Sequence, residues 1–149
     1  MWNIILILAF LLVPFFGLGF FGVAEVSRGR IATTCVFLFT GLGHFLQSKP
    51  MSAMIPVQVP KPFRLPIIYA SGVFEIVAAL ALLVPGWSRP IGILLCLFLV
   101  AVLPANIDAA LRRVPFGGHR AGPSYLLIRV PLQLALLRWI YWFQVRPPA

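Results

Sequence analysis

Five polar side chains with the chemistry to bind a ligand or transfer a proton stand in long apolar runs of the sequence: His44, Glu75, Asn106, Arg129 and Gln133. Glu75 is the clearest case, because it interrupts the apolar run YASGVFEIVAALALLVP. An imidazole and a carboxylate can exchange protons near neutral pH, and a guanidinium can neutralise a carboxylate. Such groups are costly in an apolar medium, and by default they mark a function there.

Helical spacing groups these side chains with further polar residues, because residues four apart are neighbours on one helix face. The pairs at this spacing are Thr40 with His44, Ser71 with Glu75, Arg129 with Gln133, and Asp108 with Arg112. The first three pairs predict polar stripes that face other helices rather than lipid. The fourth predicts an ion pair at the membrane interface that adds little stability.

The composition indicates the solvent around these residues. Of the 149 residues, 61% are hydrophobic and only 10% are charged, against about half and about a quarter in soluble domains. The sequence therefore predicts an integral membrane protein, in which spans of about 20 residues use nearly the whole chain. The net charge of +9 comes from cations scattered between apolar runs, which favours contact with membrane lipids over nucleic-acid binding.

Five apolar segments predict membrane-crossing helices. They lie at residues 4–24, 31–46, 66–85, 90–111 and 124–145. The second is short for a span, and we expect it to draw on flanking residues. The first also resembles a signal peptide, but its start lacks basic residues and its apolar run exceeds about 15 residues, which favours a retained span. The link at 47–65 holds four prolines and predicts a broken segment that lies in the interface and caps the bundle.

With five spans, the amino terminus and the two long links lie on one side of the membrane, here named side B, and the opposite side is side A. The links on side B hold Lys49, Lys61, Arg64, Arg112, Arg113 and Arg120, while side A holds Arg28, Arg30, Arg89 and Arg146. Basic loops are retained in the cytoplasm. The small excess on side B favours side B as the cytoplasmic side.

The five polar residues fall in the half of the bilayer nearer side B, and two interpretations remain open. One is a polar pocket, open toward side B, that binds an amphiphile or moves a proton. The other is a structural core in which Glu75 and Arg129 neutralise each other and the amides fix helix register. His44 favours the pocket, because imidazole titrates near neutral pH.

Other residues give weaker signals. Cys35 and Cys96 lie at similar depth, but the sequence has no C-x-x-C, so packing roles are favoured over a disulfide. His44 and His119 are the only histidines, and no metal or haem site is predicted.

Residues 30–142 resemble the DoxX family of small bacterial membrane proteins. The resemblance rests on the stretches FTGLGHFLQSKPMSAMIPVQVPKP, YASGVFEIVAALALLVP, LPANIDAAL and RVPLQLALLRW, in that order. It implies a four-helix membrane bundle in a bacterial inner membrane, and it marks His44, Glu75, Asn106, Arg129 and Gln133 as the shared polar positions. The family is associated with terminal oxidase and thiosulfate:quinone oxidoreductase complexes, although most members have no established reaction.

We therefore expect one all-α membrane domain, with a four-helix transmembrane core at residues 30–145 and an additional N-terminal span at 1–26. The leading functional hypothesis is a redox-associated membrane subunit whose pocket holds a quinone or similar lipid-like molecule, with Glu75 and His44 as proton partners and Arg129 as counter-charge. A non-catalytic scaffold or assembly factor for a membrane protein partner, or for a homo-oligomer, is the alternative. An enzyme acting on a lipid by acid/base chemistry needs a carboxylate free of its arginine.

Overall fold

The computed structural model describes residues 2–147, with the backbone alone for Trp2. All regular structure in this range is helical. The elements are α1 (Trp2–Phe20), α2 (Glu25–Leu46), α3 (Ser48–Ser52), α4 (Lys61–Ala81), α5 (Ser88–Leu111), the 3-10 segment η1 (His119–Tyr125), α6 (Leu126–Ile140) and the π-helical turn η2 (Tyr141–Val145).

Within residues 2–147, five helical segments are long and apolar enough to cross a membrane. They are Asn3–Phe20, Glu25–Leu46, Lys61–Ala81, Ser88–Leu111 and His119–Val145. The all-helical prediction is thereby confirmed, and the five predicted spans each correspond to one of these segments.

The distribution of side chains is the reverse of that in a water-soluble domain. Large apolar side chains cover the surface, with Phe20 90% and Leu127 78% exposed, whereas Glu75, Gln133 and Gln144 are buried. A soluble monomer rarely exposes apolar patches of this extent. The surface is therefore suited to contact with lipid.

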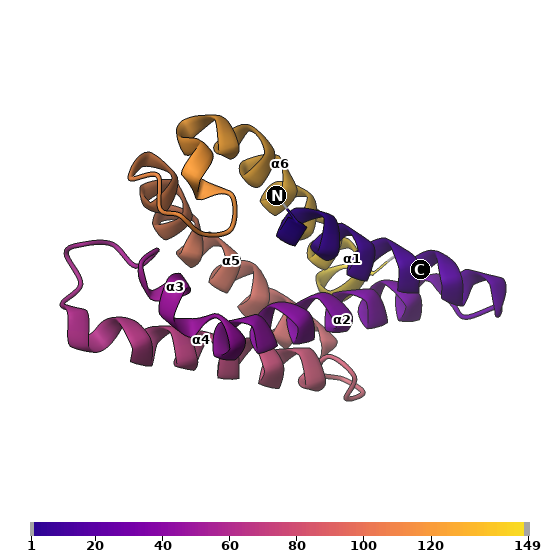
Figure 1. Ribbon diagram of the computed structural model, residues 1–149. Coiled ribbons are helices and arrows are strands. Elements are labelled where there is room, and N and C mark those ends of the chain that lie inside the picture. The colour runs from indigo at the N-terminus through magenta and orange to yellow at the C-terminus, as the bar shows by residue number, and fades with distance from the viewer. Residues whose placement is uncertain (1, 148–149) are drawn as a thin grey trace.

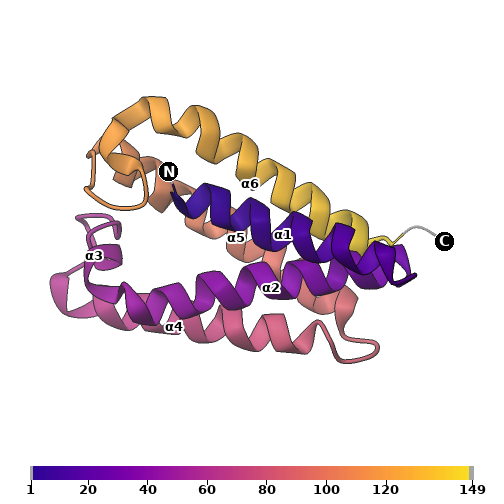
Figure 2. The same ribbon diagram turned by 45° about the vertical axis from the view of Figure 1, so that its right-hand side comes forward.

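The long helices alternate in direction, as Figures 1 and 2 show. α2 packs mainly against α1 and α4, while α5 packs against α6, η1 and η2. The turns at 21–24 and 82–87 lie at one end with the end of η2, which corresponds to side A (Figure 2). α3 and the 112–125 segment lie at the opposite end, which corresponds to side B.

The first helix contributes to the hydrophobic core. Ile4, Ile7 and Leu11 are buried in the same cluster as core residues of α2, α5 and α6. The ring of Phe10 also stacks on that of Phe39, with centroids 4.7 Å apart. α1 is therefore packed into the molecule along one face.

Two helices begin before the apolar segments that predicted them. α2 begins at Glu25 rather than at residue 31, and its first-turn cation Arg28 lies 4.9 Å from the ring centroid of Phe15 on α1, where a cation–π contact offsets the loss of solvation. α4 begins at Lys61 rather than at residue 66. A helix tolerates Pro62 in its first turn, because the amides there have no intrahelical partner.

Candidate functional site

The candidate site begins with two glycines at the crossing of α2 and α4. A Cβ atom on Gly41 would stand 3.1 Å from the carbonyl oxygen of Gly72, and a Cβ on Gly72 would stand 3.0 Å from the carbonyl oxygen of Gly41. Each glycine thus removes the side chain that would hold the other helix away. The two backbones approach closely, as small residues allow in membrane helices.

This close approach brings His44 and Glu75 together. Each lies three residues after its glycine, on the same face. The Nε2 atom of His44 is 3.6 Å from Oε1 of Glu75, and their side chains are only 12% and 8% exposed. The imidazole therefore supplies the charge partner for a carboxylate that is largely removed from solvent.

The second ring nitrogen of His44 decides where the proton lies. Nδ1 is 3.1 Å from the carbonyl oxygen of Ile68. A carbonyl oxygen can only accept, so Nδ1 carries a hydrogen and donates it. Nε2 is then the nitrogen that faces Glu75, 3.6 Å from Oε1, which is too long for a hydrogen bond. The contact is an ion pair when the imidazole is protonated.

The other carboxylate oxygen of Glu75 has no partner within residues 2–147. Oε2 is buried and accepts no hydrogen bond there. A buried acceptor without a donor is unfavourable, and at a site of this kind it marks a position where a donor from a ligand or a water can bind. The geometry therefore provides a buried imidazole–carboxylate contact with one acceptor still available.

The remaining predicted residues lie on α5 and α6. Nδ2 of Asn106 donates to the carbonyl of Val102, 3.1 Å away within its own helix. Nε2 of Gln133 donates across to the carbonyl of Leu99 on α5. Arg129 has a buried Nε without a partner among the described residues, and it lies within electrostatic reach of Tyr125.

The expected pairing of Glu75 with Arg129 does not form. Across residues 2–147, the carboxylate of Glu75 makes its ion-pair contact with His44. The two residues belong to different helix pairs, since α4 packs on α2 while α6 packs on α5. The structure thus divides the predicted cluster into a His44–Glu75 pair and a separate α5–α6 group.

Three further polar residues were predicted from helical spacing: Thr40, Ser71 and Asp108. Thr40 donates to the carbonyl of Val36, one turn back in α2, and Ser71 is half-buried on α4. Asp108 accepts from Nε of Arg112 at 2.7 Å, so the predicted ion pair is present.

Arg112 also binds the backbone of the proline-rich link at 47–65, a contact that the sequence did not indicate. Its guanidinium donates to the carbonyls of Ala53, Met54 and Ile55, each at 3.2 Å. Arg64 binds the same link from α4, through the carbonyls of Val57 and Val59. The proline-broken link, which ends at Pro60, is thereby tied to both α5 and α4 at side B.

α4 offers the surface on which the start of this link packs. Because Gly72 lies opposite Gly41, α4 extends beyond the side B end of α2 by about six residues, or about 9 Å. α3 packs on α4, and the Tyr69 hydroxyl donates to Oγ of Ser48 at 3.2 Å. The predicted capping segment is therefore formed by α3 and the turns that follow it.

A second buried polar contact, near side A, was missed. Nε2 of Gln144 donates to Oγ1 of Thr33 at 2.7 Å, and Thr33 donates to the carbonyl of Gly29 at 2.8 Å. Gln144 lies in η2, at the side A end of the apolar segment predicted at 124–145. The close crossing at Gly41 and Gly72 has a clearer sign in the sequence than the Gln144–Thr33 contact. Gly41-x-x-His44 and Gly72-x-x-Glu75 repeat one spacing on two helices.

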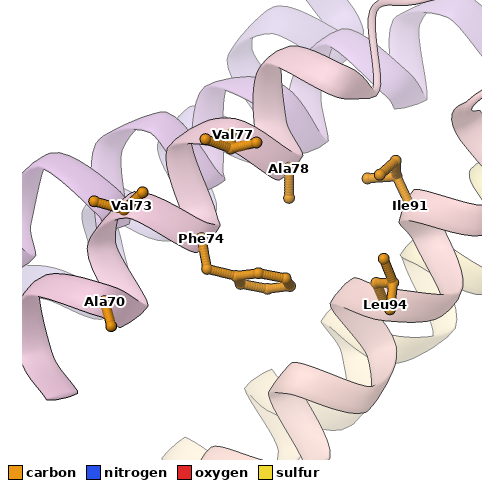
Figure 3. Close-up of a pocket in the computed structure, with 7 residues that line it drawn as sticks. All are labelled: Ala70, Val73, Phe74, Val77, Ala78, Ile91 and Leu94. Atoms are coloured by element: carbon orange, nitrogen blue, oxygen red, sulfur yellow. The ribbon is translucent and has the colours of Figure 1, made fainter.

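An apolar groove runs between α4 and α5, with a volume of about 490 Å³. Figure 3 shows Phe74 of α4 pointing across it toward Leu94 of α5. Its lining is hydrophobic: Ala70, Val73, Phe74, Val77, Ala78, Ile91 and Leu94. The groove lies on the same helix as Glu75 and is suited to an alkyl chain rather than a polar head group.

Cys35 and Cys96 are both free thiols.

A family model described as "Domain of unknown function (DUF8561)" matches residues 33–144 of the chain. The matched segment contains both glycines, the His44–Glu75 pair and the α5–α6 group, and it leaves α1 outside. No curated protein and no solved structure matches the chain.

Proposed function

The chain belongs to the family described as "Domain of unknown function (DUF8561)", and we propose that within a membrane it binds a lipid-like molecule with an ionisable head group and exchanges a proton with it. One observation carries this proposal: Nε2 of His44 lies 3.6 Å from Oε1 of the buried Glu75, while Oε2 of Glu75 has no partner among the described residues. A pure charge-neutralising pair has no need of a free acceptor.

A quinone is the ligand we favour, in line with the resemblance to the DoxX family. A bound quinone supplies reversible two-electron chemistry in which its oxygens gain or lose protons. His44 and Glu75 fit that role, because a proton held at Nε2 or on the carboxyl group would pass to an oxygen of the reduced quinone and return to the pair when the quinol is oxidised. The groove along α4 and α5 fits an isoprenoid or acyl chain.

The electrons in this proposal pass through a partner. Residues 2–147 contain no group of three or more His, Cys, Asp or Glu side chains placed to hold a metal ion. In this proposal the protein is a redox-associated subunit that acts beside a membrane protein partner, which supplies the electrons. Its location is a bacterial inner membrane, with side B in the cytoplasm and α1 as an additional span beside a four-helix core.

The alternative function is a non-catalytic scaffold, and a specific observation favours it too. Asn106 and Gln133 bind backbone carbonyls of α5, which is what amides that only fix helix register do. Under this alternative, His44 and Glu75 hold α2 to α4, and the partner is a protein that docks on the apolar surface.

The test compares ligands retained by wild type, Glu75→Gln and Ser71→Ala after gentle extraction from the native membrane. Glutamine keeps the size of Glu75 but cannot exchange a proton, while Ser71 is half-buried one turn away on α4 and outside the pair. Native mass spectrometry identifies the retained molecules, and the thermal unfolding of each variant reports its folding.

The proposal expects a molecule of quinone mass with wild type and with Ser71→Ala, and its loss from Glu75→Gln at unchanged stability. Retention of the same lipids and proteins by all three samples, with lower stability of Glu75→Gln alone, would support the scaffold instead. His44→Gln adds a second test, because it removes the proton site but leaves Glu75 in place.

A further inference from the structure

A second cavity lies at side A, far along the chain from the His44–Glu75 pair. It has a volume of about 490 Å³ and is lined by Arg89, Tyr141, Val145, Arg146 and Pro147. Arg89 is in the first turn of α5, and Tyr141 begins η2. Two guanidinium groups from distant parts of the sequence therefore line one cavity.

No acidic residue lines the cavity beside these two arginines. The chain contains only three acidic residues. Glu75 contacts His44 and Asp108 pairs with Arg112, while Glu25, at the start of α2, is not among the lining residues. Two cations on one cavity repel each other unless an anion lies between them, so the cavity favours an anionic ligand.

The groups around the cavity are those that bind phosphate. Arginine presents a planar fork of donors that matches phosphate oxygens. The first turn of α5 adds backbone amides without intrahelical acceptors and the positive end of the helix dipole.

The cavity also adjoins residues typical of a membrane surface. Trp87 and Trp142 are about half exposed near it in the sequence, and tryptophan and tyrosine gather at the level of lipid head groups. Val145 and Pro147 give the cavity an apolar wall. A phosphate group at this level can therefore belong to a lipid whose chains lie along the neighbouring helices.

We propose that Arg89, Arg146 and Tyr141 form a phosphate-binding site at side A, which takes the head group of an anionic phospholipid. The site is independent of the His44–Glu75 pair and requires only that α5 and η2 meet at the membrane surface. Arg89 and Arg146 hold the phosphate oxygens, and the Tyr141 hydroxyl donates a further hydrogen bond.

The experiment titrates the delipidated full-length protein, in a non-ionic detergent, with phosphatidylglycerol, and native mass spectrometry measures the bound fraction. The variants are Arg89→Gln and Arg146→Gln. Arg138→Gln is the matched control, because it removes the same charge near the same end of the molecule. Arg138 does not line the cavity, and its Cζ atom lies 5.8 Å from the ring centroid of Trp142. Diacylglycerol with the same acyl chains tests for the phosphate, and inorganic phosphate serves as a competitor.

We expect Arg89→Gln and Arg146→Gln each to weaken phosphatidylglycerol binding about tenfold, because each loses one charge-assisted hydrogen bond. Arg138→Gln should bind phosphatidylglycerol as wild type does, and wild type should bind diacylglycerol more weakly than phosphatidylglycerol. Displacement of the lipid by millimolar inorganic phosphate, with the same dependence on the two arginines, would keep the site but assign it to a soluble phosphate. Equal weakening by Arg138→Gln, or equal binding of diacylglycerol, would overturn the proposal.

Discussion

Replacing Gly72 with alanine tests whether two glycines set the crossing of α2 and α4. The new Cβ would stand 2.7 Å from Cβ of His44 and 3.0 Å from the carbonyl oxygen of Gly41. Carbon atoms in contact lie about 3.5–4.0 Å apart, so the helices must separate by about 1 Å. Neither neighbour is the far end of a flexible side chain, and the strain cannot be relieved by a rotamer change.

The size of the effect follows from a comparison with Gly43→Ala. A Cβ on Gly43 meets no atom within 4 Å. Both substitutions gain the same helix propensity, about 0.8–1.0 kcal/mol, so this term cancels in their difference. What remains is the overpacking at residue 72, which costs about 1–3 kcal/mol.

The assay is an equilibrium unfolding titration of both variants in one detergent, followed by circular dichroism. We expect Gly72→Ala to be less stable than Gly43→Ala by about 1–3 kcal/mol. We also expect it to lose the ligand retained through the His44–Glu75 pair, because the displaced helix carries His44 with it. Equal stability of the two alanine variants would refute the role of the glycines.

Two further predictions concern contacts that the sequence did not reveal. Thr33→Val leaves the buried amide of Gln144 without its acceptor and should lower the free energy of unfolding by about 1–3 kcal/mol. Adding Gln144→Leu should recover part of this loss. If the stability losses of the two single variants simply add in the double variant, the contact is contradicted. Arg112→Gln releases the carbonyls of residues 53–55 and should speed cleavage of the 53–60 link by a non-specific protease, whereas the exposed Arg120→Gln should not; equal rates for the two variants would show that Arg112 does not hold the link.

Some features of the fold follow from short-range properties of the chain. The five apolar helices were predictable, because length and composition decide whether a segment can cross a membrane. The stretch without a long helix between α2 and α4 was also predictable, because it holds Pro56 and Pro60 between α3 and α4 and proline disfavours a helix interior. The exact helix starts at Glu25 and Lys61 were not predictable from composition. The first depends on the contact of Arg28 with the Phe15 ring, and the second depends on the free amides of a first turn, which tolerate Pro62.

The candidate site shows where the tertiary structure takes over. The position of a residue along a helix follows from the sequence at about 1.5 Å per residue, so the depths of His44, Glu75 and Arg129 could be compared in advance. Which of them meet depends on which helices are neighbours. The chain carries two possible partners for Glu75, and only the close α2–α4 crossing at Gly41 and Gly72 selects the imidazole over the guanidinium. Depth is a local property of the chain, whereas the choice of neighbour is made by packing between segments distant in sequence.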